Sequence, residues 1–286
     1  MSAHHESPFF SPRRFARLAR LQWQEQGRAW GMFALVLAVL LVLVAGLMLS
    51  GDGRGATTGV QVPVYLTGLL LSGYLFAHQV LGVWRSREAS LLYLMRPAST
   101  FEKWLLSALT LLVLYPLLYT AVFAAVNAVA GELGYRMALA AAQKMSNADM
   151  GADWRTSVDV ADFVTFVPLR PHPSVLKLLS LPAQAAWAIV YVTMMAYAAL
   201  GLVVFRRHAA MRTLVTAIGL CILTFLLMAG FHDSVNWRAV SAWWLSPDER
   251  EGLAPAAFVY SWAFWAGIPL LLGAASYRAL REKDLS

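Results

Sequence analysis

The sequence predicts an all-α integral membrane protein with six transmembrane helices, and three observations support this fold class. Hydrophobic residues make up 59% of the 286 residues and charged residues only 14%, against roughly 45–50% and about 25% in soluble globular chains. The mean hydropathy is +0.58. The charged residues lie between long apolar runs. This composition excludes an ordinary soluble enzyme and a disordered chain, and the single cysteine, Cys221, excludes a disulfide scaffold.

Six apolar stretches are long enough to span a membrane, because a helix needs about 20 residues to cross a hydrocarbon core of about 30 Å. Pro116, Pro182 and Pro269 lie inside three of these stretches. We expect kinks and not breaks there, since neighbouring helices can satisfy the freed backbone groups. The predicted spans are 29–49, 62–84, 105–130, 178–205, 213–231 and 256–277.

The distribution of lysine and arginine predicts that both termini are cytoplasmic. Fifteen of the 23 basic residues lie in the connections on the side of the termini, and eight lie in the longer loops opposite. Cytoplasmic loops of membrane proteins carry this excess. The chain then consists of a cytoplasmic N-terminus at 1–28 and a transmembrane domain at 29–286, with outer segments at 131–177 and 232–255.

An amphipathic segment precedes the first predicted span. Ser11-Pro12 is typical of an N-cap followed by proline at the first helical position. We expect an interfacial helix that lies in the membrane plane as an elbow and transmits movement to the first span. The plainer interpretation is a topology signal with a frayed start. The polar stripe of this segment consists of Arg13, Arg17, Arg20 and Gln24. The apolar stripe consists of Phe15, Leu18, Ala19 and Trp23.

The segment 91–104, LLYLMRPASTFEKW, predicts a short helix, a sharp break and a new helix. Ser99 and Glu102 have the S-x-x-E spacing of a capping box, and Pro97 disfavours helix in the residue before it. Two interpretations stay open. In one, Pro97, Ser99, Glu102 and Lys103 only cap and anchor the third span. In the other, the short helix ending at Met95 also docks a cytoplasmic partner.

The docking interpretation depends on charges that orient a contact and on leucines that give it an apolar face. The candidate docking residues are Arg85, Arg87, Glu88, Leu91, Leu92 and Leu94.

This stretch resembles the "LPAS-x-x-EK" signature of a group of small bacterial ABC-2-type transporter membrane subunits. The segment 205–213, FRRHAAMRT, is similar to the short basic link between the fourth and fifth spans of that family. The length, the six spans and the basic amphipathic N-terminus also agree. Two residues depart from the pattern, Arg96 where the family usually has Leu and Arg212 where it usually has Lys.

The resemblance implies an ABC-2-type transmembrane domain in a bacterial inner membrane, paired with a second copy of itself and exporting a substrate by alternating access. ATP and magnesium would then be bound by a separate ABC-type ATP-binding subunit. None of the four lysines follows a G-x-x-x-x-G phosphate-binding pattern. We therefore expect no cofactor in this chain, and ATP hydrolysis only from the partner subunit.

No Asp, Glu, Lys or Arg lies deep in the six predicted spans, which disfavours a proton-driven carrier and favours an external motor. We find no H-E-x-x-H motif or other catalytic set, no metal-ligand pattern and no basic cluster for nucleic acid. The main alternative is a non-transporting membrane scaffold or accessory protein.

Three minor expectations concern the remaining apolar residues. Cys221 is expected to be small and buried. The apolar residues of 158–167 are expected to pack on the membrane or on a second subunit. Trp237, Trp243 and Trp244 belong either to an interfacial aromatic belt or to re-entrant outer helices like those of ABC-2 subunits.

Overall fold

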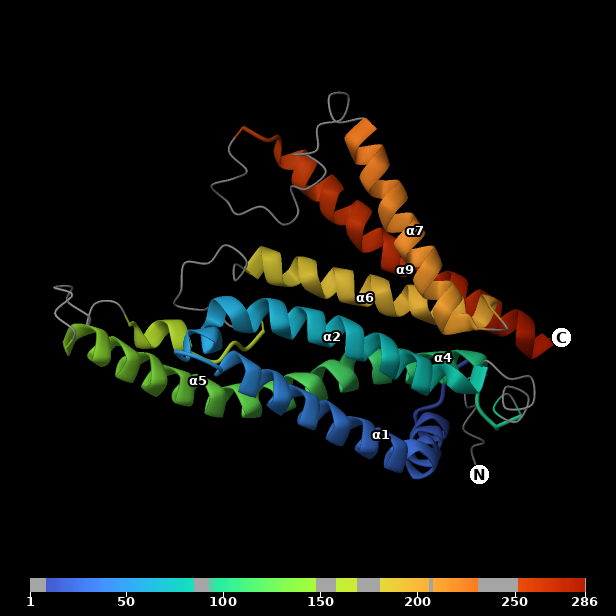
Figure 1. Cartoon of the computed structure of the whole chain (residues 1–286). Coiled ribbons are helices and arrows are strands. Elements are labelled where there is room, and N and C mark those ends of the chain that lie inside the picture. The colour runs from blue at the N-terminus through green and yellow to red at the C-terminus, as the bar shows by residue number, and fades with distance from the viewer. Residues whose placement is uncertain are drawn as a thin grey trace. The chain divides into compact units, whose positions relative to one another are not determined.

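The computed structural model describes residues 9–84, 93, 95–147, 158–168, 181–205, 208–230 and 252–285. All regular elements within these ranges are helical (Figure 1). Five of the helices are long and apolar enough to cross a membrane, as expected for an all-helical, multi-pass membrane protein. The chain divides into two compact units: unit 1 contains Met1–Gly27, Gly73–Leu114 and Ala185–Ser286, and unit 2 contains Arg28–Ser72 and Tyr115–Gln184.

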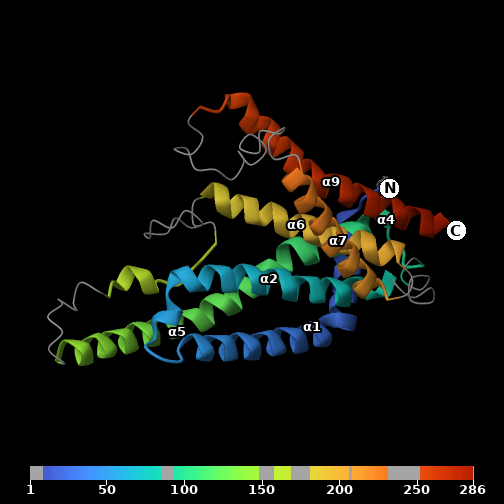
Figure 2. The same ribbon diagram turned by 45° about the horizontal axis from the view of Figure 1, so that its top comes forward.

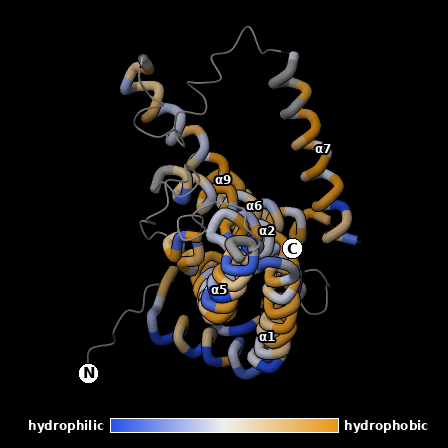
Figure 3. Tube along the Cα trace, turned by 60° about the vertical axis from the view of Figure 1, so that its left-hand side comes forward, coloured by the Kyte–Doolittle hydropathy of each residue, from blue (hydrophilic) through white to orange (hydrophobic). Residues whose placement is uncertain are grey.

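A single helix, α1 (Pro12–Met48), covers both the predicted interfacial helix and the first predicted span. An interfacial helix followed by a separate span is predicted here, whereas the helical conformation continues without interruption. No proline lies between the two parts, and Gly27 costs a helix only about 1 kcal/mol relative to alanine. The part of α1 labelled in Figure 3 is largely apolar, as a membrane-spanning segment requires.

In unit 2, the short element that precedes α2 (Thr58–Val80) packs against α5 (Tyr115–Asn147). The 3₁₀-helix η1 (Arg54–Ala56) follows Gly53, whose φ of 80° is left-handed and favours glycine. A Cβ atom on Gly134 of α5 would lie 2.6 Å from the Ala56 Cβ. Glycine at position 134 therefore allows η1 and α5 to pack closely.

The core of unit 2 is a cluster of aromatic rings around Tyr65. Its ring centroid lies 5.3, 5.0 and 5.2 Å from those of Tyr119, Phe123 and Phe166. The Gln61 side chain positions Phe166, because the Gln61 Oε1 accepts the Phe166 N–H at 2.9 Å. This polar contact between α2 and the segment 158–168 is buried, so it helps to set the register of the segment.

The segment 158–168, with the 3₁₀-helix η5 (Val160–Phe163), corrects one expectation. Phe163 and Phe166 are buried within unit 2 and do not pack on the membrane or on a second subunit, whereas Val160 and Val164 are exposed. The two phenylalanines were misassigned because their burial depends on partners about 28 to 105 residues away.

The third predicted span lies in a helix that changes its winding. It begins as α4 (Thr100–Leu109), passes through the π-helix η3 (Thr110–Leu114) and continues as α5. Pro116 has no N–H, so it can donate neither to Leu112, four residues before it, nor to Leu111, five residues before it. The Tyr191 hydroxyl of α6 donates to the Leu111 carbonyl at 2.7 Å instead.

Helix α5 also extends beyond the predicted span, so residues 131–147 of the predicted outer segment are helical and not a loop. The physical reason is the local composition: the stretch 137–144 consists mainly of alanine, leucine and methionine, the strongest helix formers. Sequence hydropathy detected where the apolar run ends but not where the helix ends.

The last three helices belong to unit 1 apart from the start of α6: α6 (Leu181–Val204), α7 (Ala209–Gly230) and α9 (Pro255–Leu285) (Figure 2). The predicted kink at Pro182 is wrong, because this proline lies in the first turn of α6, where its missing N–H removes no helical bond. Pro269 lies inside α9, whose helical conformation continues through it.

Helix α7 corresponds to the predicted fifth span and packs closely on α6 at one point. A Cβ atom on Gly201 would lie 2.2 Å from the Thr213 Oγ1, so only glycine fits there. Cys221 is exposed on α7, which corrects the expectation that it is buried. The three tryptophans of the predicted outer segment 232–255 lie outside the described residues.

Candidate functional site

The start of α4 brings together the polar residues of the predicted cap motif. The Ser99 Oγ accepts the Glu102 N–H at 3.2 Å, and the Glu102 Oε2 accepts the Ser99 N–H at 2.9 Å. This reciprocal pair is the capping box that the S-x-x-E spacing predicts. Pro97 is exposed before the cap, and Lys103 is buried after it.

The second oxygen of Glu102 binds the start of α1. The Oε1 accepts the Ser11 N–H at 2.6 Å and an N–H of the Arg14 guanidinium at 3.1 Å. Glu102 is fully buried, so its charge is stabilised by these donors and by the N-termini of two helices, where the helix dipole favours an anion. We call Ser11, Arg14, Ser99 and Glu102 the Glu102 junction.

The residues before α1 add to this junction. The Ser99 Oγ donates to the Phe9 carbonyl at 2.7 Å, and the Phe9 ring stacks on Phe101 with centroids 4.4 Å apart. Sequence reasoning found the capping box because it is local. It missed Phe9 and Arg14 because their partners lie about 90 residues away, and no periodicity signals such a contact.

Arg96 forms a second link to α1. Its guanidinium lies 2.7 Å from a carboxylate oxygen of Glu25 and 4.9 Å from the centroid of the Tyr93 ring. Burial raises the pKa of Tyr93 to about 12, against the opposing effect of the Arg96 charge, so the phenol is neutral at physiological pH. Arg96, a departure from the family signature, thus ties the motif segment to α1 in this chain.

The predicted docking residues lie outside the described residues, so their role stays a prediction. They are Arg85, Arg87, Glu88, Leu91, Leu92 and Leu94.

The amphipathic pattern of the N-terminal part of α1 is correct on its polar side and partly wrong on its apolar side. Arg13, Arg17 and Arg20 are exposed and Leu18 is buried, with Phe15 half-buried. Trp23 is 60% exposed, although it was assigned to the side of Leu18. Gln22 is buried in its place, four residues after Leu18.

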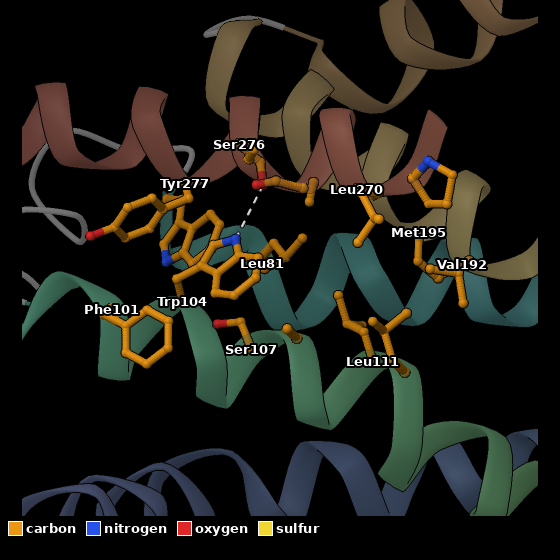
Figure 4. Close-up of a pocket in the computed structure, with 18 of the residues that line it drawn as sticks. Leu81, Phe101, Trp104, Ser107, Leu111, Val192, Met195, Leu270, Ser276 and Tyr277 are labelled. Atoms are coloured by element: carbon orange, nitrogen blue, oxygen red, sulfur yellow. Dashed lines mark hydrogen bonds between the residues drawn. The ribbon is translucent and has the colours of Figure 1, made fainter. Parts of the chain in front are cut away.

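Unit 1 also contains an apolar cavity of about 600 Å³ between α4 and α9, which we call the α4–α9 cavity (Figure 4). Phe101, Trp104 and Tyr277 lie at one end, and Leu111, Met195 and Leu270 lie toward the other. Its volume lies within the range of small-molecule sites, about 300–1,000 Å³.

Three polar side chains that border the cavity, those of Trp104, Ser107 and Ser276, already bind protein groups. The Trp104 indole N–H donates to the Ser276 hydroxyl at 3.2 Å, and the Ser276 hydroxyl donates to the Gly273 carbonyl at 2.7 Å. The Ser107 hydroxyl donates to the Lys103 carbonyl at 3.1 Å. The cavity is therefore suited to an apolar guest that requires no hydrogen bonds.

The described part of the chain offers no group of three or more His, Cys, Asp or Glu side chains that could hold a metal ion. Comparison with protein-family models, curated proteins and solved structures finds no match to this chain. The resemblance to ABC-2 subunits therefore depends on the sequence motifs, and the structure contributes the geometry of the Glu102 junction and of the cavity.

Proposed function

We propose that this chain is the membrane-spanning subunit of an ATP-driven ABC-2-type transporter. In this proposal it has six spans, with α7 as the fifth, and both termini lie in the cytoplasm at a bacterial inner membrane. Two copies pair and bind a separate cytoplasmic ATPase, which supplies ATP and magnesium. The complex exports its substrate by alternating access.

The observation that carries the proposal is the Glu102 junction. The two parts of the chain that resemble the family, the amphipathic N-terminus and the motif segment, are joined there. Two hydrogen bonds connect them, from the Ser11 N–H to Glu102 and from the Ser99 hydroxyl to the Phe9 carbonyl, together with the Arg14–Glu102 ion pair. A push on the motif segment would therefore reach the starts of α1 and α4 together. This rigid connection is what a subunit driven by an external motor requires.

The absence of internal energy coupling also supports the proposal. The six predicted spans contain no Asp, Glu, Lys or Arg in their interior, and intramembrane charges usually mark proton or ion relays. A transporter without such a relay needs energy from another subunit.

Co-expression with the ABC-type ATPases of its own host tests the proposal. We expect one ATPase to copurify with the tagged chain, and the complex to hydrolyse ATP in proteoliposomes. The chain alone is expected to show no ATP hydrolysis above background. A non-transporting scaffold would copurify with no ATPase, and ATP hydrolysis that survives removal of every copurifying protein would contradict the assignment of ATP to a partner.

A further inference from the structure

We propose that the α4–α9 cavity binds one acyl chain of an anionic membrane phospholipid, with the head group at the aromatic end. The cavity is lined by carbon-rich side chains of η2 (Leu81–Trp84), α4, η3, α6 and α9. An acyl chain needs no hydrogen-bond partner, and Ser107, Ser276 and Trp104, which border the cavity, already bind protein groups.

The shape of the cavity fits a single chain. Its lining residues follow α4 from Phe101 and Trp104 into η3 at Leu111, and α9 from Tyr277 to Leu270 (Figure 4). Aromatic side chains with polar tips concentrate at membrane interfaces, and aliphatic side chains concentrate in the hydrocarbon core. The aromatic end therefore marks the head-group level, and the hydroxyl of Tyr277 points away from the cavity there (Figure 4).

The charges near the aromatic end indicate an anionic head group. Arg278 directly follows Tyr277, and Arg281 lies one helical turn beyond it; both are exposed. Arg13 and Arg17 are exposed on α1, shortly after the cavity-lining Phe9. The acidic groups described there do not balance them, because Glu102 is buried and paired with Arg14, and between 270 and 282 the one exposed acidic side chain is Glu282. Exposed arginines near a membrane surface attract anionic lipid.

Photo-crosslinking of the full chain in phosphatidylcholine vesicles tests the proposal. The probe is a trace of phosphatidylglycerol that carries a diazirine on one acyl chain, and mass spectrometry locates the labelled peptides. We expect labelling around Leu111, Met195 and Leu270 to exceed labelling of the exposed apolar face of α1. Equal labelling of the two regions would overturn the proposal.

Two alanines of α6 provide a matched pair of variants. Ala196 lines the cavity, whereas Ala188 is exposed on the same helix and does not line it. Ala196→Phe is expected to lower labelling of the cavity about tenfold, which corresponds to about 1.4 kcal/mol, and Ala188→Phe is expected to leave it unchanged. Unchanged labelling in folded Ala196→Phe would overturn the proposal.

Competition in the unmodified chain keeps the test independent of folding defects. Unlabelled phosphatidylglycerol is expected to displace the probe, and equal displacement by added phosphatidylcholine would overturn the anionic preference and the proposal with it. Labelling by a diazirine fatty acid but not by the phosphatidylglycerol probe would also overturn it. None of these readouts requires an ATPase, so they can fail or succeed independently of the proposed transport function.

Discussion

Glu102 accepts hydrogen bonds from three donors: the N–H groups of Ser11 and Ser99, and the Arg14 guanidinium. An ionised carboxylate suits this arrangement because both of its oxygens only accept. An amide at the same position would direct an NH₂ group toward donors. At least one buried N–H would then lose its acceptor, and Arg14 would lose its counter-charge.

We therefore expect Glu102→Gln to lower the free energy of unfolding by about 1–3 kcal/mol, the cost of leaving a buried polar group unsatisfied. The measurement is the thermal unfolding midpoint in detergent. Glu132→Gln is the matched control, because Glu132 is exposed and pairs with Arg136 one turn along α5 at 2.7 Å. Such pairs contribute only about 0.3–0.5 kcal/mol. Equal midpoint shifts in the two variants would show that the buried carboxylate has no special role.

The helix that contains η3 depends on a hydroxyl from α6. Tyr191 donates to the buried Leu111 carbonyl, to which Pro116 cannot donate. We expect Tyr191→Phe to destabilise the protein by about 1–3 kcal/mol, because the buried carbonyl loses this donor. Tyr197→Phe, which removes an exposed bond to Thr216, is expected to cost less.

A double-mutant cycle separates this hydrogen bond from general packing. Pro116→Ala restores an N–H at position 116, which can take over the freed carbonyl. In that background Tyr191→Phe is expected to cost markedly less than in the unmodified chain. Additive effects in the thermal unfolding midpoint would mean that Tyr191 stabilises the helix by ring packing alone.

The local elements were predictable to the extent that their causes are local. The Ser99–Glu102 box needs only residues within one turn, so its spacing was sufficient. Hydropathy indicated the apolar helices for the same reason, and five of the described helices are long and apolar enough to cross a membrane. It did not locate the end of α5, because Ala138–Ala142 propagates a helix whether or not it lies in lipid. The contacts of Ser11 and Phe166 join distant parts of the chain and were not predictable from spacing.

The membrane topology of the whole chain can be tested by cysteine labelling. The excess of basic residues on one side predicts that Ala141 and Ser246 lie outside and that the 85–103 and 206–212 loops lie inside. Cys221 is exposed, so the background must be Cys221→Ala. Cysteines at positions 141 and 246 are expected to react with an impermeant maleimide in intact cells. Labelling of position 141 only after permeabilisation would contradict the six-span arrangement.

The assembly with an ATPase depends, in our proposal, on the loop before the Glu102 junction. Reversal of both charges, Arg87→Glu with Glu88→Arg, is expected to weaken copurification of the ATPase. The subunit is expected to stay inserted and folded, because charges in a predicted surface connection contribute little to stability. Ser99→Ala is expected to lower stability first and to affect partner binding only afterwards. It removes a cap that contributes about 0.5–2 kcal/mol and the bond to the Phe9 carbonyl, so the unfolding midpoint falls before partner binding is affected.

Copurification of the ATPase, measured beside the unfolding midpoint, distinguishes the two effects. If the charge reversal leaves the complex intact while Ser99→Ala abolishes it, the ATPase binds the capped junction itself and not the short helix predicted before it.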